Sequence, residues 1–144
     1  MEKIGLFGAA GAIGQSVAAE LRARHIPYRV VGRSSAPLKE AFGGDPLAEI
    51  ATWEPSQPES VRAAARGLTA IVHLVGVNYW QFEQHPIVMQ QTLAGACAEG
   101  VDRLLLIGTV YPYGRPQTPT VNEEHPREPH TFKGRARWSR CTTC

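Results

Sequence analysis

The 144-residue sequence has few of the features that mark membrane, secreted or nucleic-acid-binding proteins. No apolar run approaches the roughly 20 residues that span a bilayer. The first residues lead into a strand, not into a basic region followed by a cleavable apolar stretch. A net charge of only +2 argues against a general nucleic-acid surface. These absences predict a cytoplasmic globular protein without membrane or nucleic-acid partners.

Cysteine is also scarce, with three residues in the whole chain. Three are too few for a disulfide framework. Cys97 falls within a predicted helix, where we expect it to be buried. Cys141 and Cys144 have the C-x-x-C spacing, but no second ligand pair and no flanking redox motif accompany them. We therefore predict no metal site.

Glycine, in contrast, is regularly spaced near the start of the chain. An apolar stretch beginning at Ile4 runs into a turn with glycines at positions 8, 11 and 14 and then into an alanine-rich helix. Gly8 suits a tight turn, Gly11 allows the backbone to approach a pyrophosphate, and Gly14 permits close packing of the helix on the strand. This pattern predicts a phosphate-binding turn.

The G-x-x-G-x-x-G spacing alone is weak evidence and also fits a glycine-rich loop without a ligand. Here a helix over Gln15–Arg24 and a strand over Tyr28–Val31 complete a βαβ unit around it. The N–H groups at the helix start, near Ala12 and Ile13, are then expected to face the phosphates of a dinucleotide.

The residues after the second strand indicate which dinucleotide binds. An acidic residue about twenty positions after the glycines accepts hydrogen bonds from the adenosine ribose in NAD-binding proteins. This chain has Arg33 and Ser34 there instead. A guanidinium pairs with a 2′-phosphate and a hydroxyl adds a hydrogen bond, which favours NADP over NAD. The alternative is a solvated loop arginine.

The rest of the chain alternates between strands and helices. Further strands are predicted at Leu47–Ala51, Ala70–Val75 and Arg103–Ile107, and further helices at Pro58–Arg66 and Phe82–Glu99. The last two strands are apolar without alternation, as in parallel sheets covered on both faces. The pattern predicts an α/β protein of the Rossmann type, with a doubly wound parallel sheet of about five strands.

The C-terminal part breaks this pattern. Five of the eleven prolines lie between positions 112 and 129, so residues 111–132 are predicted to form a loop. A basic helix follows and loses its periodicity at Trp138. We therefore expect an NAD(P)-binding domain over residues 1–137 and an atypical tail over 138–144.

With these features, the chain resembles the extended short-chain dehydrogenase/reductase superfamily, in particular its NAD(P)-dependent epimerase/dehydratase group. Four sequence blocks carry the resemblance, over residues 8–14, 31–34, 70–76 and 106–114. The resemblance implies hydride transfer at a carbinol or carbonyl carbon of a small or sugar-nucleotide substrate. It also implies that Gly76 passes close to the cofactor ribose and that Thr109 and Lys133 serve the reaction centre. From the residues alone, a strand-end hydroxyl that satisfies a turn is the favoured interpretation of Thr109.

Two departures from the family pattern stand out. The family's Tyr-x-x-x-Lys pair would place a tyrosine at position 129, which is proline, and no tyrosine follows Tyr113. His130 is the nearest titratable substitute. The chain also stops eleven residues after Lys133, before the sixth strand and substrate region of extended family members.

The early end suggests a truncated chain, in which the uncovered sheet edge needs a second copy or another partner to cover it. Three functions stay open on this basis. The chain is an NADP-dependent oxidoreductase or epimerase/dehydratase, a non-catalytic NADP-binding sensor, or an inactive remnant.

Overall fold

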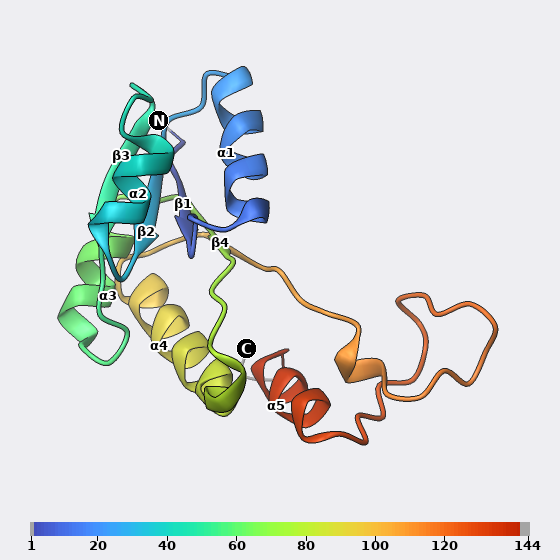
Figure 1. The fold of residues 1–144 in the computed structure, drawn as a ribbon. Coiled ribbons are helices and arrows are strands. Elements are labelled where there is room, and N and C mark those ends of the chain that lie inside the picture. The colour runs from blue at the N-terminus through green and yellow to red at the C-terminus, as the bar shows by residue number, and fades with distance from the viewer. Residues whose placement is uncertain (1, 142–144) are drawn as a thin grey trace. The chain divides into compact units, whose positions relative to one another are not determined.

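The computed structural model describes residues 2–141, with the side chains of residues 139–141 left out, and separates into two units. The first unit comprises Met1–Gly76 and Gln91–Ile107, and the second comprises Val77–Gln90 and Gly108–Cys144. Figure 1 shows the elements of both units.

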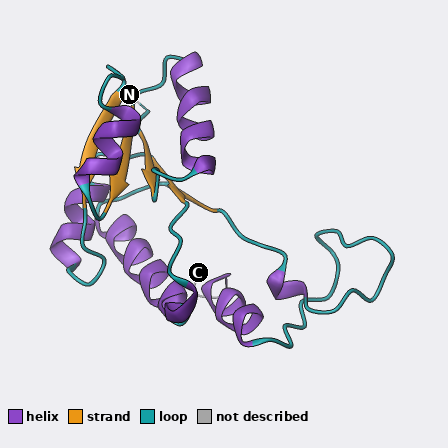
Figure 2. Ribbon diagram, in the orientation of Figure 1, coloured by secondary structure: helices purple, strands orange, loops and turns teal. Residues whose placement is uncertain are grey.

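The first unit is built on a five-stranded parallel sheet (Figures 1 and 2). Its strands are β1 (Ile4–Phe7), β2 (Tyr28–Gly32), β3 (Ala48–Thr52), β4 (Ala70–His73) and β5 (Arg103–Leu106). They are ordered β3-β2-β1-β4-β5, so the chain reverses its direction of travel across the sheet after β3. The helices are α1 (Ala12–Ala23), α2 (Ser35–Phe42), α3 (Pro58–Ala65) and the second half of α4 (Gln84–Ala98). The predicted Rossmann-type fold is confirmed.

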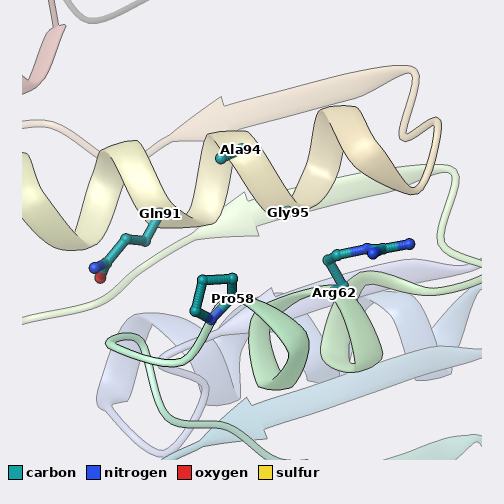
Figure 3. Close-up of a pocket in the computed structure, with 5 residues that line it drawn as sticks. All are labelled: Pro58, Arg62, Gln91, Ala94 and Gly95. Atoms are coloured by element: carbon teal, nitrogen blue, oxygen red, sulfur yellow. The ribbon is translucent and has the colours of Figure 1, made fainter.

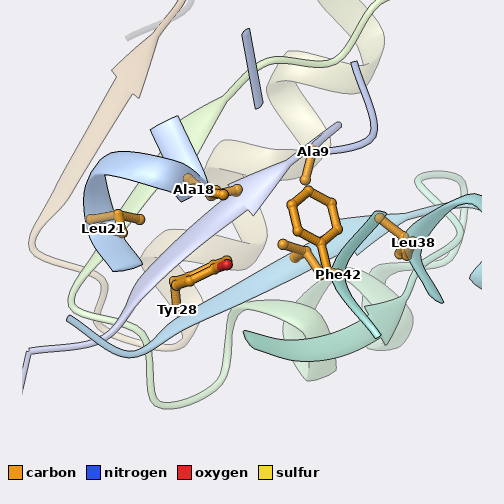
Figure 4. Close-up of a cluster of buried hydrophobic side chains, with 8 residues drawn as sticks. Ala9, Ala18, Leu21, Tyr28, Leu38 and Phe42 are labelled. Atoms are coloured by element: carbon orange, nitrogen blue, oxygen red, sulfur yellow. The ribbon is translucent and has the colours of Figure 1, made fainter. Parts of the chain in front are cut away.

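A hydrophobic cluster joins α1 and α2 to one face of the sheet. Alternate residues of β1 and β2 contribute to it because successive side chains of a strand point to opposite faces. Its buried members are Leu6, Ala9, Ala18, Leu21, Tyr28, Val30, Leu38 and Phe42 (Figure 4). The rings of Tyr28 and Phe42 meet edge to face at 6.5 Å between centroids.

The other face of the sheet packs on α3 and on the second half of α4. Phe7 and Trp53 meet edge to face at 4.9 Å. A Cβ atom on Gly95 would lie 2.5 Å from Cγ1 of Val61, so the absence of a side chain there lets α4 approach α3 closely. Arg29 donates from Nη1 to the carbonyl oxygens of Ala64 and Arg66, both at 2.8 Å, which ties β2 to the C-terminal end of α3.

Two burial predictions are wrong. We expected β5 to be apolar and buried on both faces, but Arg103 and Leu105 are exposed, Leu105 to 59%. They share one face of a strand whose outer edge carries no further strand among residues 2–141. Cys97 is exposed rather than buried. Gly95 and Ala96 occupy the buried side of α4, and a helical step of about 100° turns the next residue away from it.

The second unit contains two short 3₁₀ helices, η1 (Tyr79–Gln81) and η2 (Tyr111–Tyr113), the first half of α4, and α5 (Phe132–Cys141). The segment between η2 and α5 has neither helix nor strand, apart from an isolated bridge between Gly114 and Glu128. α5 continues through the predicted tail boundary at 137 to Cys141. The C-x-x-C motif extends to Cys144, which lies outside the described residues.

A polar pair anchors β2 to the turn that follows α2. Tyr28 donates from its hydroxyl to Oδ2 of Asp45 at 2.5 Å, and the Asp45 side chain is only 3% exposed. This hydrogen bond is the main reason that the pKa of Asp45 lies below its usual value, and the Leu47 amide and Arg22 also lower it. Burial and the Asp45 carboxylate raise the pKa of Tyr28, which therefore stays protonated.

Replacing Asp45 with asparagine is expected to lower the free energy of unfolding by about 1–3 kcal/mol at pH 7, the usual size for a hydrogen bond to a charged group. A carboxyl with a lowered pKa contributes stability above its unfolded value of about 3.9 and loses it as the pH falls through the folded value. Urea unfolding should therefore show the difference from wild type shrinking below about pH 4. D102N, at an exposed aspartate, is the control, with a change within about 0.5 kcal/mol. A D45N effect that persists unchanged in acid would contradict this account.

Candidate functional site

Three predicted site residues follow the carboxyl ends of neighbouring strands in the first unit. Gly8 follows β1, Arg33 follows β2, and Gly76 lies shortly after β4. β1 lies between β2 and β4, where the strand order reverses. In open α/β sheets, ligands bind outside the carboxyl ends of strands at such a reversal. The topology thus brings these residues to one edge of the sheet.

The β1–α1 turn packs so closely on neighbouring backbone that side chains do not fit at two of its glycines. Gly8 has a φ of +88°, and a Cβ there would lie 2.9 Å from backbone atoms of Leu74 and Val75. A Cβ on Gly14 would lie 2.2 Å from the carbonyl oxygen of Ala9. The N–H of Gly8 donates to Val31 at 2.8 Å, which ties the turn to β2. These glycines are therefore required by the fold, and their contact with a cofactor stays a prediction.

Gly11 differs from the other two glycines. Apart from its neighbours in the chain, no described residue has an atom within 4 Å of its Cβ position, and its φ of −76° is one that any residue adopts. It is the N-cap of α1, where no side chain forms a cap hydrogen bond and the first turn has no acidic residue. The neighbouring Ala12 and Ile13 are exposed, Ile13 to 56%. The positive end of this helix therefore fits an anionic group such as a pyrophosphate.

Arg33 and Ser34 are both exposed, and Ser34 begins α2 without a side-chain cap hydrogen bond. Sequence reasoning missed Glu54, which follows β3. The Ser56 amide and hydroxyl donate to its carboxylate at 3.1 and 2.8 Å. These bonds are the main causes of the lowered pKa of Glu54, and the charge of Arg33 adds to them. An ionised carboxylate therefore accompanies Arg33 at neutral pH. The only sequence signal for Glu54 was the position of an acidic residue after the third predicted strand.

In the second unit, Lys133 lies against an aromatic pair. Its Nζ atom is 4.0 Å from the ring centroid of Tyr79 and 5.8 Å from that of Phe82. These distances are typical of cation–π contacts. Tyr79 is 66% exposed although it contacts the lysine. Sequence reasoning missed this tyrosine because it precedes Lys133 by a long stretch of chain.

The remaining predicted residues also lie in the second unit. The Thr109 hydroxyl accepts a hydrogen bond from the Tyr111 amide at 3.5 Å. This is the turn interaction that the sequence offered as the alternative to a catalytic role. His130 is exposed, and its carbonyl oxygen accepts a hydrogen bond from Arg135. Catalytic roles for Thr109 and Lys133 stay predictions.

A pocket of about 110 Å³ lies between α3 and α4 in the first unit (Figure 3). It is lined by Pro58, Arg62, Gln91, Ala94 and Gly95, none of which is a predicted site residue. Arg62 is engaged by Glu99, with Nε 2.9 Å from the carboxylate. Over the described part of the chain, there is no cluster of side chains suited to a metal ion, and no helix is both long and apolar enough to cross a membrane.

Comparison with known proteins relates this geometry to a family. A family model for NAD(P)H-binding proteins matches residues 8–139. An epimerase family protein of Mycobacterium leprae is 30% identical over 132 residues, covering 83% of this chain and 40% of that protein.

Solved structures share the fold. The UDP-Glc/GlcNAc 4-epimerase of Campylobacter jejuni matches with a TM-score of 0.84 and 22% identity, over 99% of this chain and 47% of that one. A short-chain dehydrogenase/reductase superfamily protein of Agrobacterium tumefaciens with bound NAD matches with a TM-score of 0.81 and 23% identity, over 99% and 44%.

This chain spans less than half the length of each of these proteins. Within that length, the family match extends from the first glycine of the turn to the last helix. The resemblance seen in the sequence is thereby confirmed at the level of family and fold: the chain belongs to the NAD(P)H-binding family, and its fold is that of the 4-epimerase and short-chain dehydrogenase/reductase structures.

Proposed function

We propose that the first unit binds NADP, with the pyrophosphate at the N-terminus of α1 and the 2′-phosphate at Arg33. The observation that carries this is the start of α1, which has unfilled space at Gly11 and neither an acidic residue nor a side-chain cap. Arg33 supplies a bidentate donor for a phosphate. The Glu54 carboxylate beside it disfavours a second anion, so the preference for NADP over NAD rests on the balance between these two charges.

When bound, the nicotinamide would accept or donate a hydride at a carbinol or carbonyl carbon of a small or sugar-nucleotide substrate. As the resemblance implies, Lys133 and Thr109 would serve the reaction centre. Tyr79 would exchange a proton with the reacting oxygen of the substrate, replacing the tyrosine that is absent at position 129. The contact between Tyr79 and Lys133 supports this last role, since it pairs an exposed hydroxyl-bearing ring with the lysine. A non-catalytic NADP sensor and an inactive remnant are the competing functions.

The variant R33A is expected to weaken NADPH binding by roughly ten- to a hundredfold, because a lost charge-assisted hydrogen bond costs about 1.5–3 kcal/mol. NADH carries no 2′-phosphate, so its dissociation constant should change less than twofold. Calorimetric titration of both nucleotides measures the difference. The control is R24A, which removes another exposed arginine, paired with Glu20, from the same unit. An equal loss for NADH would show that Arg33 does not read the 2′-phosphate.

Alanine substitutions at Gly11 and Gly14 should have different effects on nucleotide affinity and on the free energy of unfolding. G11A places a methyl group in space that no described residue fills, so the free energy of unfolding should change by no more than about 1 kcal/mol. Affinity for both NADPH and NADH should nevertheless fall at least tenfold. G14A drives a methyl group into the Ala9 carbonyl and should cost about 1–3 kcal/mol or more. Unaltered nucleotide binding by folded G11A would place the pyrophosphate elsewhere.

The role of Tyr79 can be tested by NADPH oxidation with a panel of carbonyl substrates. Removing a proton-transferring group typically costs 10²–10⁴-fold in rate. Y79F should therefore lower kcat by at least a hundredfold while the NADPH dissociation constant stays within twofold. Y111F is the control, because Tyr111 is another exposed tyrosine of the same unit. Wild-type kcat in Y79F would contradict the assignment, and tight NADPH binding without turnover of any substrate would favour the sensor.

A further inference from the structure

The proline-rich segment is closed at its base into a compact loop, residues 114–128. Gly114 and Glu128 form a parallel bridge that joins its two ends. Gly114 has a φ of +74°, and a Cβ there would lie 2.0 Å from the Glu128 carbonyl oxygen. Loops of this size with adjoining ends are ordered by their own side chains. The 114–128 loop therefore needs an internal group to hold it.

His125 is that internal group. His125 is 6% exposed, and its ring forms two hydrogen bonds with the backbone of the loop. Nε2 lies 3.0 Å from the Gln117 amide nitrogen, which can only donate, so Nε2 must accept. Nδ1 lies 2.8 Å from the Pro126 carbonyl oxygen, which can only accept, so Nδ1 must carry the hydrogen. The two partners together require the neutral ring with its hydrogen on Nδ1.

Aromatic contacts link the loop to both flanking elements. The His125 ring meets Tyr113 of η2 edge to face at 5.9 Å. Arg127 lies over Tyr113 at 5.4 Å and over Trp138 of α5 at 5.3 Å. The loop thus fastens the 3₁₀ helix before it to the helix after it, on which Lys133 stands.

If Nε2 were protonated, it could no longer accept the Gln117 N–H, and the charged groups around His125 would not supply another acceptor. Arg127 opposes a second positive charge on the same aromatic cluster. Glu128 accepts a hydrogen bond from the Gln117 side chain at 2.8 Å, and Glu123 and Glu124 precede the histidine. These three carboxylates favour a protonated ring, but they are exposed and therefore screened by water and salt. None of these side chains can accept the Gln117 N–H bond in place of Nε2 without moving.

We propose that His125 is a pH-sensitive latch for the 114–128 loop. A proton taken up from solvent occupies the Nε2 lone pair, so the imidazolium presents N–H to the Gln117 N–H and that hydrogen bond is lost. The loop then opens at its centre, and the contacts of Arg127 with Trp138 loosen. An unperturbed histidine changes charge between pH 5 and 8, so this is the range over which the latch is tested. This regulation is independent of the cofactor proposal.

The test is NMR of the full chain from pH 8 to pH 5. At pH 8, the ¹⁵N shifts of His125 should show the hydrogen on Nδ1. Solvent exchange of the Gln117 amide, corrected for its intrinsic rate, should accelerate at least tenfold on going to pH 5. In H125Q, a side-chain carbonyl can accept the Gln117 N–H and cannot titrate, so the corrected rate should not depend on pH.

H130Q is the control, since it removes the neighbouring histidine, which is exposed. It should retain the full pH response of the wild type. A response lost in H130Q, or retained in H125Q, would overturn the proposal. So would a constant wild-type exchange rate. If H125Q fails to order the loop, the wild-type tautomer still decides, because a hydrogen on Nε2 at pH 8 is incompatible with the latch.

Discussion

The structure depends most on the close passage of the β1–α1 turn past its neighbours. Gly8 brings the backbone against the end of β4, and Gly14 brings the first turn of α1 against Ala9. A side chain at either place would push strand and helix apart, and with them the hydrophobic cluster that includes Leu6 and Ala18. The same compactness leaves the N–H groups of α1 pointing at the open space around Gly11. Packing and the proposed anion site thus have one cause at this turn.

The charge distribution at the sheet edge is more balanced than an arginine alone would make it. The helix end is positive and Arg33 adds a full charge, but the ionised Glu54 stands near that arginine. A carboxylate at the end of the neighbouring strand can accept hydrogen bonds from ribose hydroxyls, as the acidic residue does in NAD-binding relatives of this fold. The proposed preference for NADP over NAD is then a small difference between the attraction of Arg33 and the repulsion of Glu54.

The sequence predicts the parts of this molecule that depend on local patterns. Apolar strands, the glycine turn and helix ends are encoded by neighbouring residues, so the Rossmann-type sheet was predictable. Burial on particular faces was not, because Leu105 and Cys97 owe their exposure to which elements cover them. The contact between Tyr79 and Lys133 was equally hidden, since it joins residues from distant segments. Charge partners across strands, such as Glu54 for Arg33, require the strand order.

The proline-rich segment shows why composition alone is an incomplete guide to order. Proline excludes it from regular elements, and residues 115–127 indeed form none. Side-chain contacts nevertheless take the place of the backbone hydrogen bonds of a helix or sheet, because His125 satisfies two backbone groups and Arg127 stacks on two aromatic rings. Order that rests on one neutral imidazole depends on the protonation state of that ring, whereas a ladder of backbone hydrogen bonds does not. A change of a single proton can therefore alter this segment while leaving the sheet of the first unit intact.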